Sequence, residues 1–125
     1  IECNNTSFEK SIIELAKSIS SNVFKIKYDD RKKIHLAAVF ACNFSNRMIG
    51  ISKEIMENNN LDFSLIKPLI NQTMKKISEG EPNKLLTGPA KRKDVKIIKN
   101  HIKLIKNTEH KKIYELISKD IMNLE

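Results

Sequence analysis

The chain has no tryptophan and only two cysteines, three glycines and three prolines among its 125 residues. So few glycines and prolines give too few turn signals for a many-stranded sandwich or barrel. Cys3 near the chain start and Cys42 inside an apolar stretch do not form a disulfide framework, so we expect a reduced, cytoplasmic setting. No apolar run reaches the length of a membrane span, and no signal peptide is predicted. These absences predict a mainly α-helical domain with one hydrophobic core.

Positive charge is in excess: the chain has 23 Lys and Arg residues, 15 Asp and Glu residues and a net charge of +8. Such a balance suits nucleic acid, acidic lipid or an anionic ligand. However, nearly all the cations are lysines, and aromatic residues do not alternate with them as nucleic-acid binding favours. We therefore attribute the charge mainly to the Lys-, Asn- and Ile-rich background, and nucleic acid is the least favoured partner.

The first 28 residues carry a pattern that differs from the rest. Apolar residues from Phe8 to Ile19 keep helical spacing, and the β-prone stretch 23–26 follows. We expect a short strand–helix–strand here, the shape of the last unit of an open α/β sheet. Because the chain opens on Ile1 rather than Met, we also expect it to be a piece of a longer protein.

A long helix is predicted from Asp29 or Asp30 to about Glu57, or about 43 Å at 1.5 Å per residue. Small side chains on this helix would let another helix approach closely, so we expect it to be central and shared between domains or subunits. They are Ala37, Ala38, Ala41 and Ser45.

Three further helices are predicted by apolar spacing and by their end signals. Asp62 can cap the first, Pro68 either kinks it or marks a restart, and Gly80 ends it. The second starts near Asp94, and the break at 107–108 separates it from the last.

The long helix also carries three uncharged polar groups, His35, Asn43 and Asn46. At α-helical spacing, Asn46 returns to within about 20° of His35, and Asn43 lies about 80° from it. If that side is buried they need hydrogen-bond partners, and if it lines a cleft they can hold a ligand. Taken alone, His35 fits a satisfied core or interface histidine better.

The turn from Thr87 to Asp94 joins Gly88, Pro89, three cations and a helix-starting carboxylate. A stiff turn that presents backbone N–H groups and positive charge at a helix start can bind an anion. The alternative is a Gly-Pro helix connection with incidental charge, which the turn alone favours. His101, on the helix that follows, fits a surface histidine bonded to a neighbour better than a ligand.

Sites for metals and nucleotides are not predicted. His35 and His101 lack Asp, Glu or Cys partners at ligand spacing, which argues against a metal site. Gly50, Gly80 and Gly88 are far apart in the chain, so it cannot bind a pyrophosphate in the Rossmann manner.

Two segments together resemble a known family. The stretch His35-Leu36-Ala37-Ala38-Val39-Phe40-Ala41-Cys42-Asn43-Phe44, followed by Thr87-Gly88-Pro89-Ala90-Lys91-Arg92-Lys93-Asp94 and His101, is similar to the C-terminal domain of a bacterial family of predicted NADP-dependent oxidoreductases. Segments 67–73 and 114–118 match as well, so the resemblance covers about residues 29–122. In that family a Rossmann-like domain precedes a helical domain of unknown function.

The resemblance implies a helical bundle around one long helix, as in the C-terminal domains of 6-phosphogluconate dehydrogenase-type enzymes, ketopantoate reductases and β-hydroxyacid dehydrogenases. Residues 1–28 would be the last unit of the Rossmann-like domain, and residues 29–125 a substrate-binding and dimerisation domain. NADP would bind mainly to the missing N-terminal domain, with no cofactor expected for this chain alone. A homodimer and an anionic small-molecule substrate are implied, without metal or membrane.

The same resemblance supplies candidate site residues. His35 and Asn43 would be catalytic, and the substrate would contact Thr87, Arg92, Asp94 and His101. Related dehydrogenases place a catalytic Lys four residues before this Asn, where the chain has Val39. His35 is then the nearby titratable group whose pKa suits proton transfer at neutral pH. Lys93 stands where the family often has Gly.

Two rival functions stay open. The helical domain could serve only for subunit assembly or as a sensor without catalysis. The second rival, nucleic-acid binding, predicts steeply salt-dependent association with DNA or RNA.

Overall fold

The computed structural model of the chain describes Ile1 and residues 6–124. Its elements are helical, and no strand occurs among these residues, which confirms the predicted mainly α-helical class. The chain divides into two compact units, residues 1–49 and residues 50–125. No helix in the described part of the chain is both long enough and apolar enough to cross a membrane. The domain boundary predicted at residue 28 stays a prediction.

The first unit begins with α1 (Thr6–Ile19), which amphipathic spacing predicted. The stretch 23–26 is extended, but it is not a strand. The terminal amine of Ile1 donates to the Phe24 carbonyl oxygen at 2.6 Å, and the Ile26 N–H donates to the Ile1 carbonyl oxygen at 3.1 Å. This is the hydrogen-bond pattern of a single parallel pair, and one pair does not make a sheet. The other half of the expected strand pair, at Glu2 and Cys3, lies outside the described residues.

The predicted long helix is present as three elements that follow one another directly: α2 (Tyr28–Ala38), η1 (Val39–Phe44) and α3 (Ser45–Glu57). It begins one residue earlier than the first predicted start. Two i,i+3 ion pairs support its first turns, Lys32–Asp29 at 3.5 Å and Lys33–Asp30 at 3.1 Å. The unexpected feature is η1, which is a π-helix with one more residue in each hydrogen-bonded turn than an α-helix.

The second unit contains η2 (Phe63–Ile66), α4 (Lys67–Glu79), η3 (Pro82–Leu85), α5 (Val95–Leu104) and α6 (Thr108–Asn123). Their limits follow the signals in the sequence. The Asp62 carboxylate accepts from the Ser64 N–H at 2.8 Å, and Pro68 lies in the first turn of α4, so it marks a restart. α4 ends before Gly80, as predicted.

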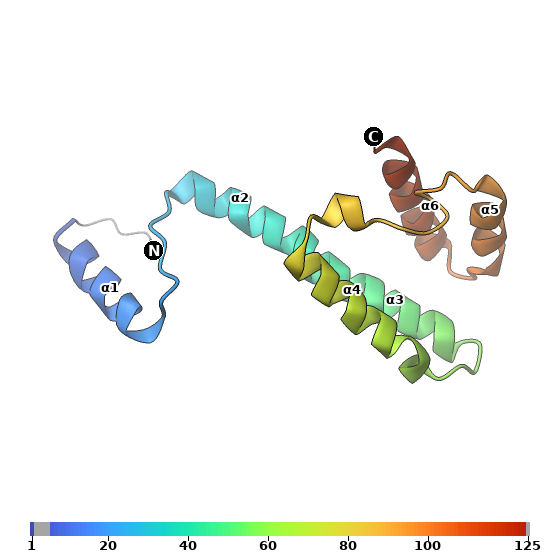
Figure 1. The fold of residues 1–125 in the computed structure, drawn as a ribbon, viewed down its shortest axis with the longest axis horizontal. Coiled ribbons are helices and arrows are strands. Elements are labelled where there is room, and N and C mark those ends of the chain that lie inside the picture. The colour runs from blue at the N-terminus through green and yellow to red at the C-terminus, as the bar shows by residue number, and fades with distance from the viewer. Residues whose placement is uncertain (2–5, 125) are drawn as a thin grey trace. The chain divides into compact units, whose positions relative to one another are not determined.

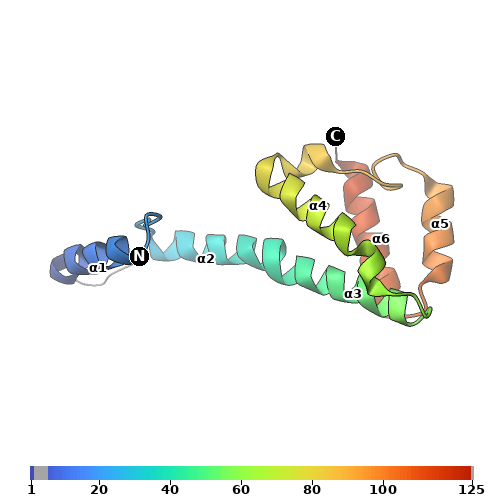
Figure 2. The same ribbon diagram turned by 60° about the horizontal axis from the view of Figure 1, so that its bottom comes forward.

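The buried residues of the described chain all belong to the second unit. They are Ile51, Ala90, Ile98 and Ile105, together with the polar residues His110 and Ser118. Figures 1 and 2 show α5 and α6 joined by a short connection, as the predicted break at 107–108 requires. The Asn107 side chain caps α6 by accepting from the His110 N–H at 3.0 Å. This small core holds the turn from Thr87 to Asp94 in place through Ala90.

Candidate substrate site and the helix-connecting turn

His35 and Asn43 belong to the first unit, and both are exposed. His35 lies on α2, and Asn43 lies in the π-helical η1. π-Helical turns are rare and frequently occur at functional sites. The angles predicted among His35, Asn43 and Asn46 assumed an α-helix throughout, so the π-helical turn changes them. Asn43 therefore lies in an unusual stretch of backbone. Its predicted catalytic role and its alignment with His35 stay predictions.

The rings of Phe40 and Phe44 meet edge to face within η1, with their centroids 5.0 Å apart. Phe40 is still 63% exposed and Phe44 48%. The polar candidates of this helix thus have large apolar neighbours that the described chain leaves uncovered.

Backbone conformation, packing and capping explain several residues of the connection from Thr87 to Asp94. Gly88 has φ +95° and Lys93 has φ +55°, both in the left-handed region that favours glycine. Ala90 is buried, so its small side chain fits the core. The Asp94 carboxylate accepts from the Ile97 N–H at 3.0 Å and caps α5. The family's glycine at the position of Lys93 has a physical reason in this left-handed conformation.

The backbone N–H groups of the last three residues of this turn are already engaged. Those of Arg92, Lys93 and Asp94 donate to the carbonyl oxygens of Gly88, Ala90 and Pro89 at 3.3, 3.0 and 2.9 Å. The Asp94 carboxylate adds negative charge at the start of α5. An anion at this turn would therefore depend on the side chains of its cations, and Arg92 is exposed and available for such a role.

His101 of α5 is exposed, and its Nδ1 lies 2.9 Å from the Tyr114 hydroxyl of α6. The two rings also meet edge to face at 5.9 Å between centroids. This is the hydrogen-bonded surface histidine that the sequence favoured. The pair links the last two helices, and Tyr114 lies in one of the segments that carried the family resemblance.

Thr87 lies at a hollow with a volume of about 290 Å³ in the second unit. One face of α4, from Leu69 to Ile77, forms one wall, and the stretch 82–87 forms the other. Thr87, a predicted substrate-binding residue, therefore lies at a concave surface.

His110, to which the sequence analysis gave no role, is 8% exposed and lies beside Glu54, with 3.6 Å between Nε2 and the carboxylate. Both line a small hollow of about 80 Å³ between the end of α3 and the start of α6. The Asn107 cap fixes the place of His110 in the first turn of α6, and the sequence does contain that cap. Its burial depends on tertiary packing, for which the sequence carries no local signal.

The structure thus brings Thr87, Arg92 and Asp94 together in one turn, followed by α5 with His101. His35 and Asn43 belong to the other compact unit. The shared cleft of all six residues stays a prediction. In the described part of the chain, no group of three His, Cys, Asp or Glu side chains could hold a metal ion.

The residues from 1 to 121 match the family model described as "Domain of unknown function (DUF2520)". The chain therefore belongs to this family. It is also similar to a crystal structure from Bacteroides fragilis, described as that of a "putative NADP oxidoreductase", with a TM-score of 0.91 and 36% sequence identity. The match covers 97% of this chain and 47% of that one, so the chain spans about half the length of its structural relative. No curated protein matches. The resemblance drawn from the sequence is confirmed.

Proposed function

We propose that this chain is the helical substrate-binding and dimerisation part of an NADP-dependent oxidoreductase. The observation that carries the proposal is the match to the Bacteroides fragilis protein over 97% of this chain but 47% of the relative. The other half of such a protein would bind NADP and deliver hydride, because the chain lacks a glycine pattern that could bind the pyrophosphate.

The surface of the first unit supports a role in assembly. Ile34, Leu36 and Phe40 are large apolar residues along α2 and η1, and each is more than half exposed. Large apolar residues that are exposed along one segment are typical of protein–protein contacts. The small residues Ala37, Ala38 and Ala41 would permit close approach by the same helix of a second copy. We therefore assign the α2–η1 surface, defined as residues 28–44, to the dimer interface.

The substrate would be a small anion with a carbonyl or hydroxyl group. Arg92 can hold its negative group through two parallel hydrogen bonds. His35 would donate a proton to the carbonyl oxygen or accept one from the hydroxyl, and Asn43 would orient that oxygen. In a dimer, one copy could supply His35 and Asn43 to a site that contains Arg92 of the other copy.

NADPH binding and turnover test the proposal. We expect calorimetry to detect NADPH binding to a protein that joins this chain to a nucleotide-binding domain, and no binding to this chain alone. In the joined protein, oxidation of NADPH is followed with small 2-oxo acids as substrates. His35→Ala should lower kcat about 100-fold, the scale of one general acid–base group. Lys75→Ala, in α4 and outside both the candidate site and the α2–η1 surface, should leave kcat unchanged.

Micromolar affinity of this chain alone for NADPH would contradict the division of labour. Unchanged turnover of a folded His35→Ala protein would remove His35 from the mechanism. The exposed α2–η1 surface fits a non-catalytic assembly or sensor module equally well. That alternative predicts NADPH binding by the joined protein without turnover of any substrate.

A further inference from the structure

The hollow beside Thr87 is a candidate ligand site that the proposed function does not require. It lies wholly within the second unit, between α4 and the stretch 82–87. Its volume of about 290 Å³ lies at the lower end of the range for small-molecule sites, which is about 300–1,000 Å³. A hollow of this size suits a small organic molecule rather than a dinucleotide.

The wall formed by η3 fits tightly against the end of α4. A Cβ atom placed on Gly80 would lie 3.2 Å from Leu85 Cδ1 and 3.3 Å from the Lys76 carbonyl oxygen. Glycine at this position therefore lets η3 approach the last turn of α4. Pro82 at the start of η3 fixes the backbone that follows. The backbone that precedes Leu85 thus helps to set its position against the hollow.

The lining combines an apolar surface with one cation. Leu69, Ile77, Leu85 and Leu86 contribute aliphatic side chains. Lys76 supplies an ammonium group that forms no ion pair with any described residue, since the Lys–carboxylate pairs of the structure involve other lysines. Thr87 and Gln72 add hydrogen-bonding groups, whereas the Thr73 hydroxyl already donates to the Leu69 carbonyl oxygen at 2.9 Å. An unpaired cation beside aliphatic side chains is complementary to an amphipathic anion.

We propose that this hollow binds a small aliphatic carboxylate, with the carboxylate at Lys76 and the hydrocarbon against Leu69, Ile77 and Leu85. Thr87 donates a hydrogen bond to the same carboxylate. The site does not rest on the proposed function, in which Arg92 and not Lys76 holds the anionic group of the substrate. Binding itself requires neither NADP nor hydride transfer, so its failure would leave the oxidoreductase role standing.

The test is an NMR titration of the full-length protein with octanoate, kept below the concentration at which octanoate forms micelles. We expect saturable shifts of the amide signals of α4 and of residues 82–87. Lys76→Gln should weaken binding about tenfold, because it removes a charge-assisted hydrogen bond. Lys75→Gln is the matched control, since Lys75 is the adjacent exposed lysine of α4 and does not line the hollow. Its affinity should equal that of the unaltered protein.

Two further probes separate the contributions of charge and chain. Octylammonium, which has the same chain and the opposite charge, should not shift these signals, and acetate should bind more weakly than octanoate. Shifts confined to residues 28–44 would overturn the site, since they would report adhesion to the α2–η1 surface. Equal affinity of the Lys76→Gln protein, or equal binding of octylammonium, would overturn it as well.

Discussion

The two compact units of the chain differ in what they bury. Residues 50–125 have a small core around Ile51, Ile98 and Ile105, whereas no described residue of 1–49 is buried. The first unit nevertheless carries large apolar side chains, including Phe24 and Phe40. The comparison indicates that the second unit is organised by contacts within the chain. The first unit leaves its large apolar side chains exposed, as the proposed dimer interface requires.

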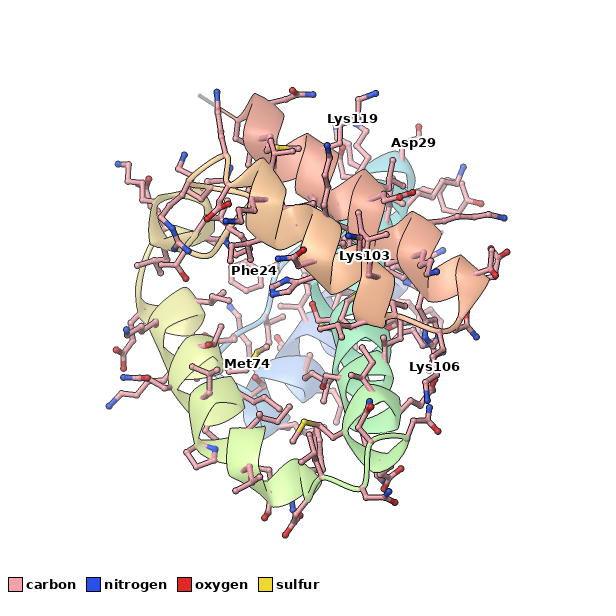
Figure 3. All side chains as sticks on the ribbon, turned by 90° about the vertical axis from the view of Figure 1, so that its right-hand side faces the viewer. Phe24, Asp29, Met74, Lys103, Lys106 and Lys119 are labelled. Atoms are coloured by element: carbon pink, nitrogen blue, oxygen red, sulfur yellow. The ribbon has the colours of Figure 1, made fainter. Side chains whose placement is uncertain are left out.

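The difference extends to charge. Most lysines of α5 and α6 are exposed, among them Lys103 and Lys119, and so is Lys106 in the connection between the two helices; all three are labelled in Figure 3. The second unit therefore places apolar residues inside and cations outside, as a helix of a globular protein does. In the first unit, the charged residues of α2 lie at 29–33, and the mainly apolar stretch 34–44 that follows is also largely exposed. The proposed dimer would cover this stretch.

The largest expected effect is on assembly. Ala38→Glu places a carboxylate in the α2–η1 surface, where a dimer would bury it without a partner, at a cost of about 3 kcal/mol. We expect the dimer Kd measured by sedimentation equilibrium to rise on the order of 100-fold. Lys75→Glu introduces the same side chain on the exposed surface of α4, outside the α2–η1 surface, and should change Kd far less. Equal Kd values for the two variants would place the interface elsewhere.

The second effect concerns the core of the second unit. Ile98→Ala should lower the free energy of unfolding by about 3 kcal/mol, because Ile98 is 7% exposed and its truncation leaves a cavity. Ile97 is 38% exposed in the same helix, and Ile97→Ala should cost about 1 kcal/mol or less. Denaturation in urea, followed by circular dichroism, measures both. Equal losses would mean that α5 does not pack through Ile98.

A smaller effect is expected at the start of α5. Asp94→Ala removes the carboxylate that caps the Ile97 N–H, at a cost of about 1 kcal/mol of unfolding free energy. Asp120→Ala in α6 removes an exposed carboxylate that caps nothing and should change stability by less than about 0.5 kcal/mol. If Asp94→Ala abolished turnover of the joined protein and left stability unchanged, Asp94 would act on the substrate and not as a cap.

The smallest effect is a pH dependence at Asp62. Hydrogen bonds from the hydroxyl and the backbone N–H of Ser64 hold the pKa of this carboxyl below its ordinary value of 3.8. A lowered folded-state pKa stabilises the fold above the unfolded pKa, and this contribution is lost as the pH falls below about 4. Asp62→Asn should remove that part of the acid destabilisation, measured as the urea midpoint against pH. An unchanged pH profile would show that the Ser64 contacts do not persist in solution.

The helix ends could be predicted because capping is local. Asp62, Asp94 and Asn107 each bond an N–H two or three residues further on, so the sequence contains both partners. The stretch 23–26 could not be predicted in the same way, because a strand needs a neighbouring strand. The burial of His110 also depends on tertiary packing that local spacing does not contain, and no signal in the sequence marked the π-helical turn at η1.

The candidate site also has features that the sequence could predict and features that it could not. The turn from Thr87 to Asp94 stood out in the sequence, and much of its composition is explained by its backbone: a left-handed Gly88, a buried Ala90 and a capping Asp94. Thr87 and Arg92 are the residues of the turn that this geometry leaves for a ligand. Their convergence with His35 stays a prediction, because His35 belongs to the other compact unit.

Sedimentation velocity of the unaltered protein tests the central claim most directly. If the first unit is completed by a second copy of the chain, the protein should sediment as a dimer at micromolar concentration. A single monomeric species at every concentration, with α2 still helical, would contradict the claim that this helix is covered by its own copy.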